Sequence, residues 1–478
     1  AKVMQIERLR VLSNSCRLAV LGSVMMVTLA SPLAAQSPQA NQFFQREQFL
    51  REDTRRQLDA GIPKEQKAIV TWGGYVIPQW QQYDDVRKQS NFRQIDLRLW
   101  GSAVIDDVHH IYARMKLIHT NFGPGDSPFG WNQDLEGPNL DQGFYELRLS
   151  KALKKYWGME LPFDSRMTIG RQFVEFGNGL SLSTILDGGT FAIETGQWRA
   201  TGLFATTVRS DENIDHSPIV ADHMDRTFGG LQVDFLGLSG HQPFAYFIVQ
   251  HDSTEEEPED YRQEYDYDSN YFGFGSNGEV VQNLRYATEV VFETGSSQKQ
   301  NNLGGSPIAA FAFDQLFEYY FPVKHDPVFG VEYAVATGDD DRTSATDTVA
   351  GNLSGRDNAF RSFGYINTGY SSAYEFTNLQ FLRTGIRFKP FPECEALRRL
   401  EVGSDLFWYW KQKVGGPVSD FRADVNSHEL GTEVDVYANY RIFSDLSVMV
   451  RYGRFWTGEA YNDDEIRDYL YAGLLYSF

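Results

Sequence analysis

Apolar and polar residues alternate one by one along many stretches of this sequence, and this period of two is the feature that most constrains its fold. Within residues 92–105, Ile95 and Leu99 fall on one face, whereas Asp96 and Arg98 fall on the other. Successive side chains of a β-strand point to opposite faces, so each such stretch predicts a strand with one apolar and one charged face. The pattern begins near residue 68 and continues to residue 478. We therefore expect an all-β chain.

Eighteen stretches carry this pattern, and the alternation is weakest in residues 190–195 and 270–276. The predicted strands are residues 68–77, 92–105, 109–121, 143–153, 166–173, 190–195, 198–208, 228–236, 243–251, 270–276, 284–294, 308–321, 328–337, 378–389, 399–411, 428–442, 446–456 and 468–478.

The connections between these strands alternate between long and short. Long connections are expected near residues 78–91, 122–142, 174–189, 209–227, 252–269, 295–307, 338–377, 412–427 and 457–467, and short ones include residues 106–108, 195–197, 322–327 and 444–445. Barrels of bacterial outer membranes have short periplasmic turns and long extracellular loops, whereas a soluble sandwich has no reason to follow this rule. The sequence therefore predicts a transmembrane antiparallel β-barrel of about 18 strands over residues 68–478, in an outer membrane of the Gram-negative type.

The N-terminal residues have a different character. Basic residues such as Arg8 and Arg17 precede a short apolar run over residues 18–30, which is typical of a secretory signal peptide, and we assign it to residues 1–35. Residues 36–67 predict an amphipathic helical segment in the periplasm. No later stretch of about 18 consecutive apolar residues follows, so no transmembrane helix is expected.

Composition agrees with a barrel and argues against other classes. The chain has 25 Tyr, 35 Phe and 9 Trp, and an outer-membrane barrel places such rings at its two membrane interfaces. The excess of 64 acidic over 44 basic residues argues against nucleic-acid binding, which needs clustered cations.

In a barrel, the polar face of each strand lines the lumen. The predicted lumen cations are Arg98, Arg114, Lys116, Arg148, Arg285, Arg383, Arg387 and Arg451, and the predicted lumen acids are Asp96, Glu146, Asp234, Glu289, Asp314, Glu318, Glu332, Asp405, Glu433 and Asp435. Guanidinium groups bind carboxylates in a planar, bidentate way, which would favour passage of polyanions such as uronic-acid polymers through an anion-selective pore. The alternative is that these bases and acids pair with one another and only stiffen the wall.

Sequence motifs of catalysis are missing. The chain has no Gly-x-Ser-x-Gly and no His-Glu-x-x-His, and the adjacent His109 and His110 point to opposite faces of a strand. We therefore expect no enzyme and no cofactor. Asp339, Asp340 and Asp341 are candidate ligands for Ca²⁺, and a solvated acidic loop is the alternative reading.

Several motifs resemble, in the same order, those of the bacterial alginate export family. They are IDLRLWG at residues 95–101, TIGRQ at 168–172, RDNAF at 356–360, TNLQ at 377–380 and RYGRFWTGEAY at 451–461. The resemblance implies a monomeric, eighteen-stranded barrel. It further implies export of an anionic polysaccharide through an arginine-lined constriction, and we expect passive, charge-guided passage or export.

The same resemblance implies constriction residues at Arg98, Arg171, Arg361 and Arg451. Arg171 alternates in step with Ile169 and so needs a bulge or a strand end to face inward. Residues 338–377, the longest connection, are the expected gate. A substrate-nonspecific porin and a barrel that sheathes a partner protein stay open as alternatives. So does a requirement for periplasmic export or scaffold proteins.

Overall fold

The computed structural model describes residues 68–84, 89–127, 132–208, 225–254, 267–298, 305–342, 352–420, 422–462 and 464–478. The predicted signal peptide and N-terminal helical segment lie outside these residues. The strands of the described chain are β1 (Ala68–Asp84), β2 (Gln89–Ile105), β3 (His109–Phe122), β4 (Gln133–Arg148), β5 (Asp164–Phe176), β6 (Leu182–Thr195), β7 (Trp198–Thr207), β8 (Arg226–Phe235), β9 (His241–Asp252), β10 (Tyr267–Val281), β11 (Leu284–Gln298), β12 (Gly305–Tyr320), β13 (Val328–Ala336), β14 (Leu379–Phe388), β15 (Leu400–Lys411), β16 (Glu429–Arg441), β17 (Leu446–Thr457) and β18 (Ile466–Ser477).

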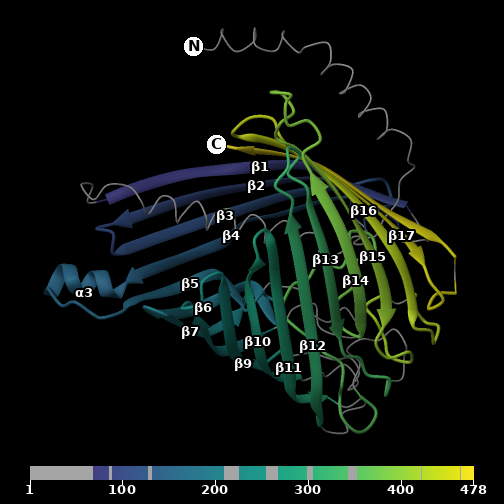
Figure 1. The fold of residues 1–478 in the computed structure, drawn as a ribbon, viewed down its shortest axis with the longest axis horizontal. Coiled ribbons are helices and arrows are strands. Elements are labelled where there is room, and N and C mark those ends of the chain that lie inside the picture. The colour runs from purple at the N-terminus through teal and green to yellow at the C-terminus, as the bar shows by residue number, and fades with distance from the viewer. Residues whose placement is uncertain are drawn as a thin grey trace.

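Each strand pairs antiparallel with its neighbour in sequence, and the first strand closes the sheet on the last (Figure 1). β1 pairs with β18 from Tyr75 opposite Ser477 to Tyr83 opposite Tyr469. The described sheet contains 18 strands. The prediction of an eighteen-stranded antiparallel barrel is confirmed, including the strands expected at residues 190–195 and 270–276.

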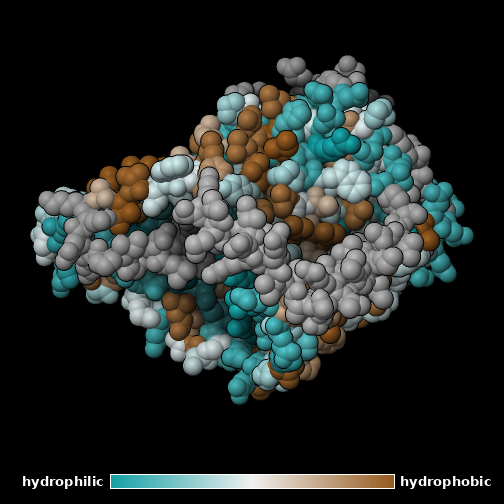
Figure 2. Space-filling model, turned by 90° about the horizontal axis from the view of Figure 1, so that it is seen from above, coloured by the Kyte–Doolittle hydropathy of each residue, from teal (hydrophilic) through white to brown (hydrophobic). Residues whose placement is uncertain are grey.

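The alternation seen in the sequence separates the two faces of the wall. On β2, Ile95 and Leu99 are exposed on the outward face, and Asp96 and Arg98 are buried on the lumen face. Outward aromatic residues include Phe274, which is 50 % exposed. Figure 2 shows several hydrophobic patches between hydrophilic regions on the face in view. This surface suits contact with lipid, which solvates apolar side chains without cost.

Several strands are longer than predicted, so the connections expected at residues 78–91, 174–189 and 295–307 are largely strand. β1, for example, continues from Pro78 to Asp84. The prediction stopped there because proline lacks an N–H and because glutamines follow it. The pairing of β1 with β18 is interrupted at residues 77 and 78 and resumes at Gln79 in the same register. Strand ends that extend past the lipid need no apolar face, so alternation fades there.

Residues 149–153, predicted to end a strand, instead begin the helix α3 (Leu149–Trp157). Leu149, Ala152, Leu153 and Tyr156 recur at helical spacing, which the strand prediction overlooked. Gly158 ends the helix in the left-handed conformation with φ of 67°. The connection from β4 to β5 is therefore long, although it lies at the end of the barrel where connections such as the turn from β2 to β3 are short. No helix of the described residues is long and apolar enough to cross a membrane.

α3 is fixed to the turn between β2 and β3 by ion pairs. Lys151 Nζ lies 2.6 Å from Asp107, and Lys155 Nζ lies 2.8 Å from Asp106. Figure 1 shows α3 beside the end of β4. The helix thus extends the wall at this end of the barrel.

Candidate functional site

Residues 352–378, here called the crossing segment, run through the lumen from one side of the wall to the other. Asp357 exchanges backbone hydrogen bonds with Pro307 and Ala309 on β12. Phe363 does the same with Ser181 and Ser183 at the start of β6. Because β6 and β12 lie on different sides of the closed sheet, the segment between them has to span the interior. The described residues of the predicted gate, 338–342 and 352–377, are therefore bonded to the wall and do not project freely outward.

Aromatic packing fills the space between the crossing segment and the wall. The ring centroids of Phe363 and Phe228 lie 4.9 Å apart, and those of Tyr374 and Tyr409 lie 5.3 Å apart. Phe360 is fully buried among the same cluster. The hydrophobic core of this barrel thus lies inside the lumen, where the segment narrows the passage.

Carboxylates of the wall hold the backbone of the crossing segment. Glu293 Oε2 on β11 accepts a hydrogen bond from the Arg361 N–H at 2.9 Å. On β16, Glu433 accepts the N–H groups of Ser371 and Ser372 at 2.6 and 2.8 Å. Acids that the sequence placed in the lumen, such as Glu433, are thus occupied by the segment. Charge-assisted bonds of this kind are short and strong.

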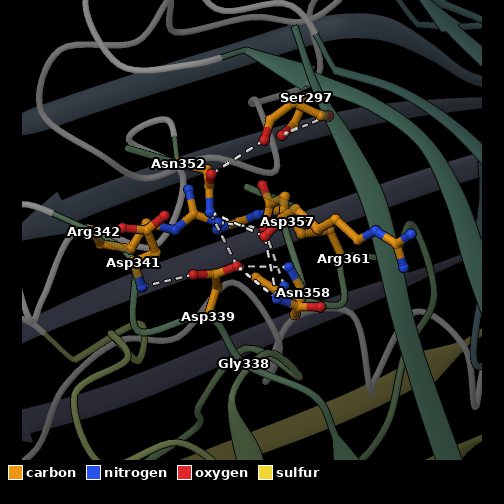
Figure 3. A network of polar contacts seen from close by, with 12 residues as sticks. Ser297, Gly338, Asp339, Asp341, Arg342, Asn352, Asp357, Asn358 and Arg361 are labelled. Carbon is orange, nitrogen blue, oxygen red and sulfur yellow. Dashed lines mark hydrogen bonds and ion pairs between the residues drawn. The ribbon is translucent and has the colours of Figure 1, made fainter. Parts of the chain in front are cut away.

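A second polar network fixes the base of the segment (Figure 3). Asp339, which is 1 % exposed, accepts hydrogen bonds from Asn352 Nδ2 and from the Asn358 N–H. Arg342 forms a buried ion pair with Asp357 at 2.6 Å. These contacts tie the segment to the end of β13.

The acidic triplet shares in this network. Asp341 accepts the N–H and hydroxyl of Ser354, and the neighbouring Asp340 is exposed. In the described part of the chain, no group of three or more His, Cys, Asp or Glu side chains could hold a metal ion. Calcium binding at Asp339, Asp340 and Asp341 stays a prediction from the sequence.

Two of the predicted lumen cations form one buried cluster. Arg98 Nη1 lies 2.9 Å from Asp141 Oδ2, and the same oxygen accepts a bond from Arg114 Nε. Arg98 also binds Asp96 at 3.0 Å. Arg114 is 0 % and Arg98 3 % exposed, so this cluster is part of the wall. Asp141 was missed because its surroundings, with Gly137, read as a loop, whereas β4 already begins at Gln133.

Other predicted cations are also paired with acids of the wall or of its turns. These pairs are Lys116 with Glu136 at 2.5 Å, Arg148 with Asp107 at 2.8 Å and Glu146 at 3.2 Å, Arg383 with Glu332 at 2.6 Å, and Arg387 with Glu318 at 2.7 Å. The alternative drawn from the sequence, that lumen bases and acids pair, therefore holds for these residues. Arg387, at 32 % side-chain exposure, still faces the open passage.

The remaining inward-facing arginines have mixed partners. Arg451 donates to Asn439 Oδ1 at 2.7 Å and lies 5.4 Å from the Tyr437 ring centroid. Arg361 is carried by the crossing segment and is 4 % exposed. Arg285 lies 4.8 Å from the ring centroid of Tyr320.

Arg171 does not join the lumen cations. It shares the row of β5 that carries the exposed Ile169, while Thr168 and Gln172 of the other row are buried. The register with β6 runs through Arg171 without a bulge, and the register with β4 ends at the pair of Gly143 and Arg171, so the strand keeps the side chain in the outward row. Its guanidinium binds Asp187 at 2.7 Å on the same outward face. The resemblance implied that Arg171 lines a constriction. The structure instead places its side chain on the outward face of the wall.

Replacing Arg171 by glutamine should therefore leave single-channel conductance unchanged, because the side chain lies outside the passage. Planar-bilayer recordings of the purified variant check this expectation. A conductance or ion preference that differs from the wild type would show that Arg171 reaches the lumen after all.

Comparisons with known proteins agree with this architecture. The family described as "Alginate export" matches residues 87–474. A search of curated proteins finds no match.

Solved porin structures share the fold at low sequence identity. OccK5 (OpdH) of Pseudomonas aeruginosa superposes with a TM-score of 0.53 and 11 % identity, covering 86 % of this chain and 97 % of that one. OccAB3 of Acinetobacter baumannii gives 0.55 and 10 %, covering 86 % and 99 %. The outer membrane protein OprD from Pseudomonas aeruginosa gives 0.51 and 11 %, covering 87 % and 95 %. With its closed eighteen-stranded barrel and a family match over nearly the whole wall, this chain belongs to the alginate export family of the outer membrane.

Proposed function

We propose that the barrel is a passive channel for an anionic polysaccharide that contains uronate residues. The observation that carries the proposal is the family match over residues 87–474. Export of a polymer through a lumen needs no covalent step, so the relevant chemistry is the affinity of the wall for the cargo.

The placement of arginines on the inner wall supports this cargo. Arg383, Arg387 and Arg451 lie on β14 and β17, on the lumen face. Arg387 is partly exposed, so a cargo carboxylate can compete with Glu318 for it without burying a new charge. Conduction requires contacts that are multiple and weak enough for the chain to move on, and exposed ion pairs of this kind meet that requirement.

A substrate-nonspecific porin is the second candidate, and the charge balance of the wall favours it. Arg98, Arg114, Arg383 and Arg387 all have carboxylate partners. A neutralised wall selects weakly between anions and cations. The two candidates differ in how a polyuronate affects the current.

Polymer block of the refolded channel in planar bilayers separates them. For an anionic-polysaccharide channel, we expect short alginate oligomers to interrupt the current reversibly, at concentrations where neutral maltodextrins of equal length do not. We also expect Arg387→Gln to shorten the blocked intervals, because one exposed guanidinium is lost.

Lys389→Gln is the matched control for this experiment. Lys389 follows β14, lies 41 % exposed and pairs with Asp326 outside the strand, so its loss removes the same charge without changing the lumen wall. If charged and neutral oligomers block the current equally, and Arg387→Gln does not change the block, our proposal is contradicted and the channel is a substrate-nonspecific porin.

A further inference from the structure

A small pocket opens in the inner wall where β10, β11 and β12 approach the short-turn end of the barrel. It has a volume of about 390 Å³ and is lined by Asn277, Glu279, Arg285, Glu318 and Tyr320, among others. This volume falls within the range of about 300–1,000 Å³ that is usual for small-molecule sites. The turns beside it, residues 282–283 and 321–327, are short, which places the pocket at the periplasmic mouth.

Arg285 is the cation of this pocket, and it forms no ion pair within the described residues, although Glu279 lies opposite it in the β10–β11 register. The residue opposite it in the β11–β12 register is Glu318. Both oxygens of Glu318 are already engaged, one by Arg387 Nη1 at 2.7 Å and the other by the Tyr320 hydroxyl at 2.8 Å. Arg285 is exposed, and it lies in the same row of β11 as the buried Glu289, on the lumen face.

Tyr320 orients this cation. Its ring centroid lies 4.8 Å from the Arg285 guanidinium carbon, within the range of a cation–π contact. An arginine held on an aromatic ring loses less conformational freedom when it binds an anion, because part of its freedom is already lost. The pocket thus holds a guanidinium whose position is already fixed by an aromatic ring. The side chains of Asn277 and Glu279 can form hydrogen bonds with hydroxyl groups of a ligand.

We infer that this pocket is a binding subsite for a single carboxylate-bearing pyranose, that is, a uronate unit. The carboxylate binds the guanidinium of Arg285 in a bidentate way, and the sugar ring packs beside Tyr320. The inference rests on the proposed function for the identity of the cargo. It adds a point of first contact for a chain that arrives from the periplasm, away from the crossing segment.

Saturation-transfer difference NMR of the detergent-solubilised full chain tests the subsite with three probes: glucuronate, glucose and acetate. Glucuronate should bind, whereas glucose lacks the carboxylate and acetate lacks the ring, so both should bind at least tenfold more weakly. Arg285→Gln should weaken glucuronate binding at least tenfold, and Arg285→Lys should give an intermediate loss because lysine keeps only the charge.

Lys324→Gln is the control, because Lys324 lies in the turn after β12 and pairs with Glu393 outside the pocket. Glucuronate binding that is equal in the wild type and in Arg285→Gln would overturn the subsite. Acetate that binds as tightly as glucuronate would overturn the assignment to a sugar. Heat-modifiable mobility on gels shows that each variant is folded.

The outcome is distinguishable from failure of the proposed function. If glucuronate binding depends on Arg285 but alginate oligomers do not block the channel, the subsite is supported and the proposed polysaccharide channel is contradicted. If the oligomers block the channel and glucuronate binding is the same without Arg285, the proposed polysaccharide channel is supported and the subsite is contradicted.

Discussion

Replacing residues 339–377 by a short flexible linker between Gly338 and Asn378 should raise the single-channel conductance several-fold. The crossing segment bonds to β12 through Asp357 and to the start of β6 through Phe363, so it divides the lumen. Removing it leaves the strand ladder intact, because β13 and β14 pair directly with each other. Ionic current through a pore rises with its open cross-section.

Planar-bilayer recordings measure this effect, and a graded variant accompanies the deletion. Glu433→Leu removes the acceptor of the Ser371 and Ser372 N–H groups and should raise the conductance or its fluctuations. Glu433→Gln keeps one acceptor oxygen and should change them less. A deletion variant that folds and conducts like the wild type would mean that the passage runs beside the segment and is not limited by it.

Much of the wall could be predicted from the sequence, because a strand's period of two is a local property. Ile95 and Arg98 are assigned to opposite faces from their parity alone, and their exposure agrees. The same reasoning correctly left Arg171 in step with Ile169. The resemblance to a family moved Arg171 to the lumen, and parity, which reflects the geometry of every strand, was the better guide.

The interior could not be predicted in the same way, since it depends on contacts between distant residues. Nothing near residue 433 indicates that its carboxylate binds the backbone at Ser371. The loop did contain a signal, because Phe360, Phe363 and Tyr374 are apolar rings in a connection that should be polar. Such rings in a loop indicate burial, although they do not say against which strands.

The Arg98 cluster leads to the largest expected effect on stability. Asp141→Asn should destabilise the folded barrel by about 3–5 kcal/mol, the usual cost of removing one partner from a buried ion pair. Asp141 Oδ2 accepts bonds from both Arg98 and Arg114, and these arginines are almost fully buried. After the substitution, Arg98 keeps its ion pair with Asp96, whereas Arg114 loses its ion pair with Asp141.

Glu136→Gln on the same strand provides the control for this prediction. Glu136 pairs with Lys116, but the two side chains are 42 % and 28 % exposed, so water replaces the lost partner and about 0.2–1 kcal/mol is expected. The temperature or urea concentration at which the heat-modifiable gel shift is lost measures both variants. Adding Arg114→Met to Asp141→Asn should recover part of the loss, because the buried guanidinium that loses the Asp141 carboxylate is then gone. Equal stability of Asp141→Asn and Glu136→Gln would mean that water reaches the cluster, and the wall at Arg98 would then be open to the lumen.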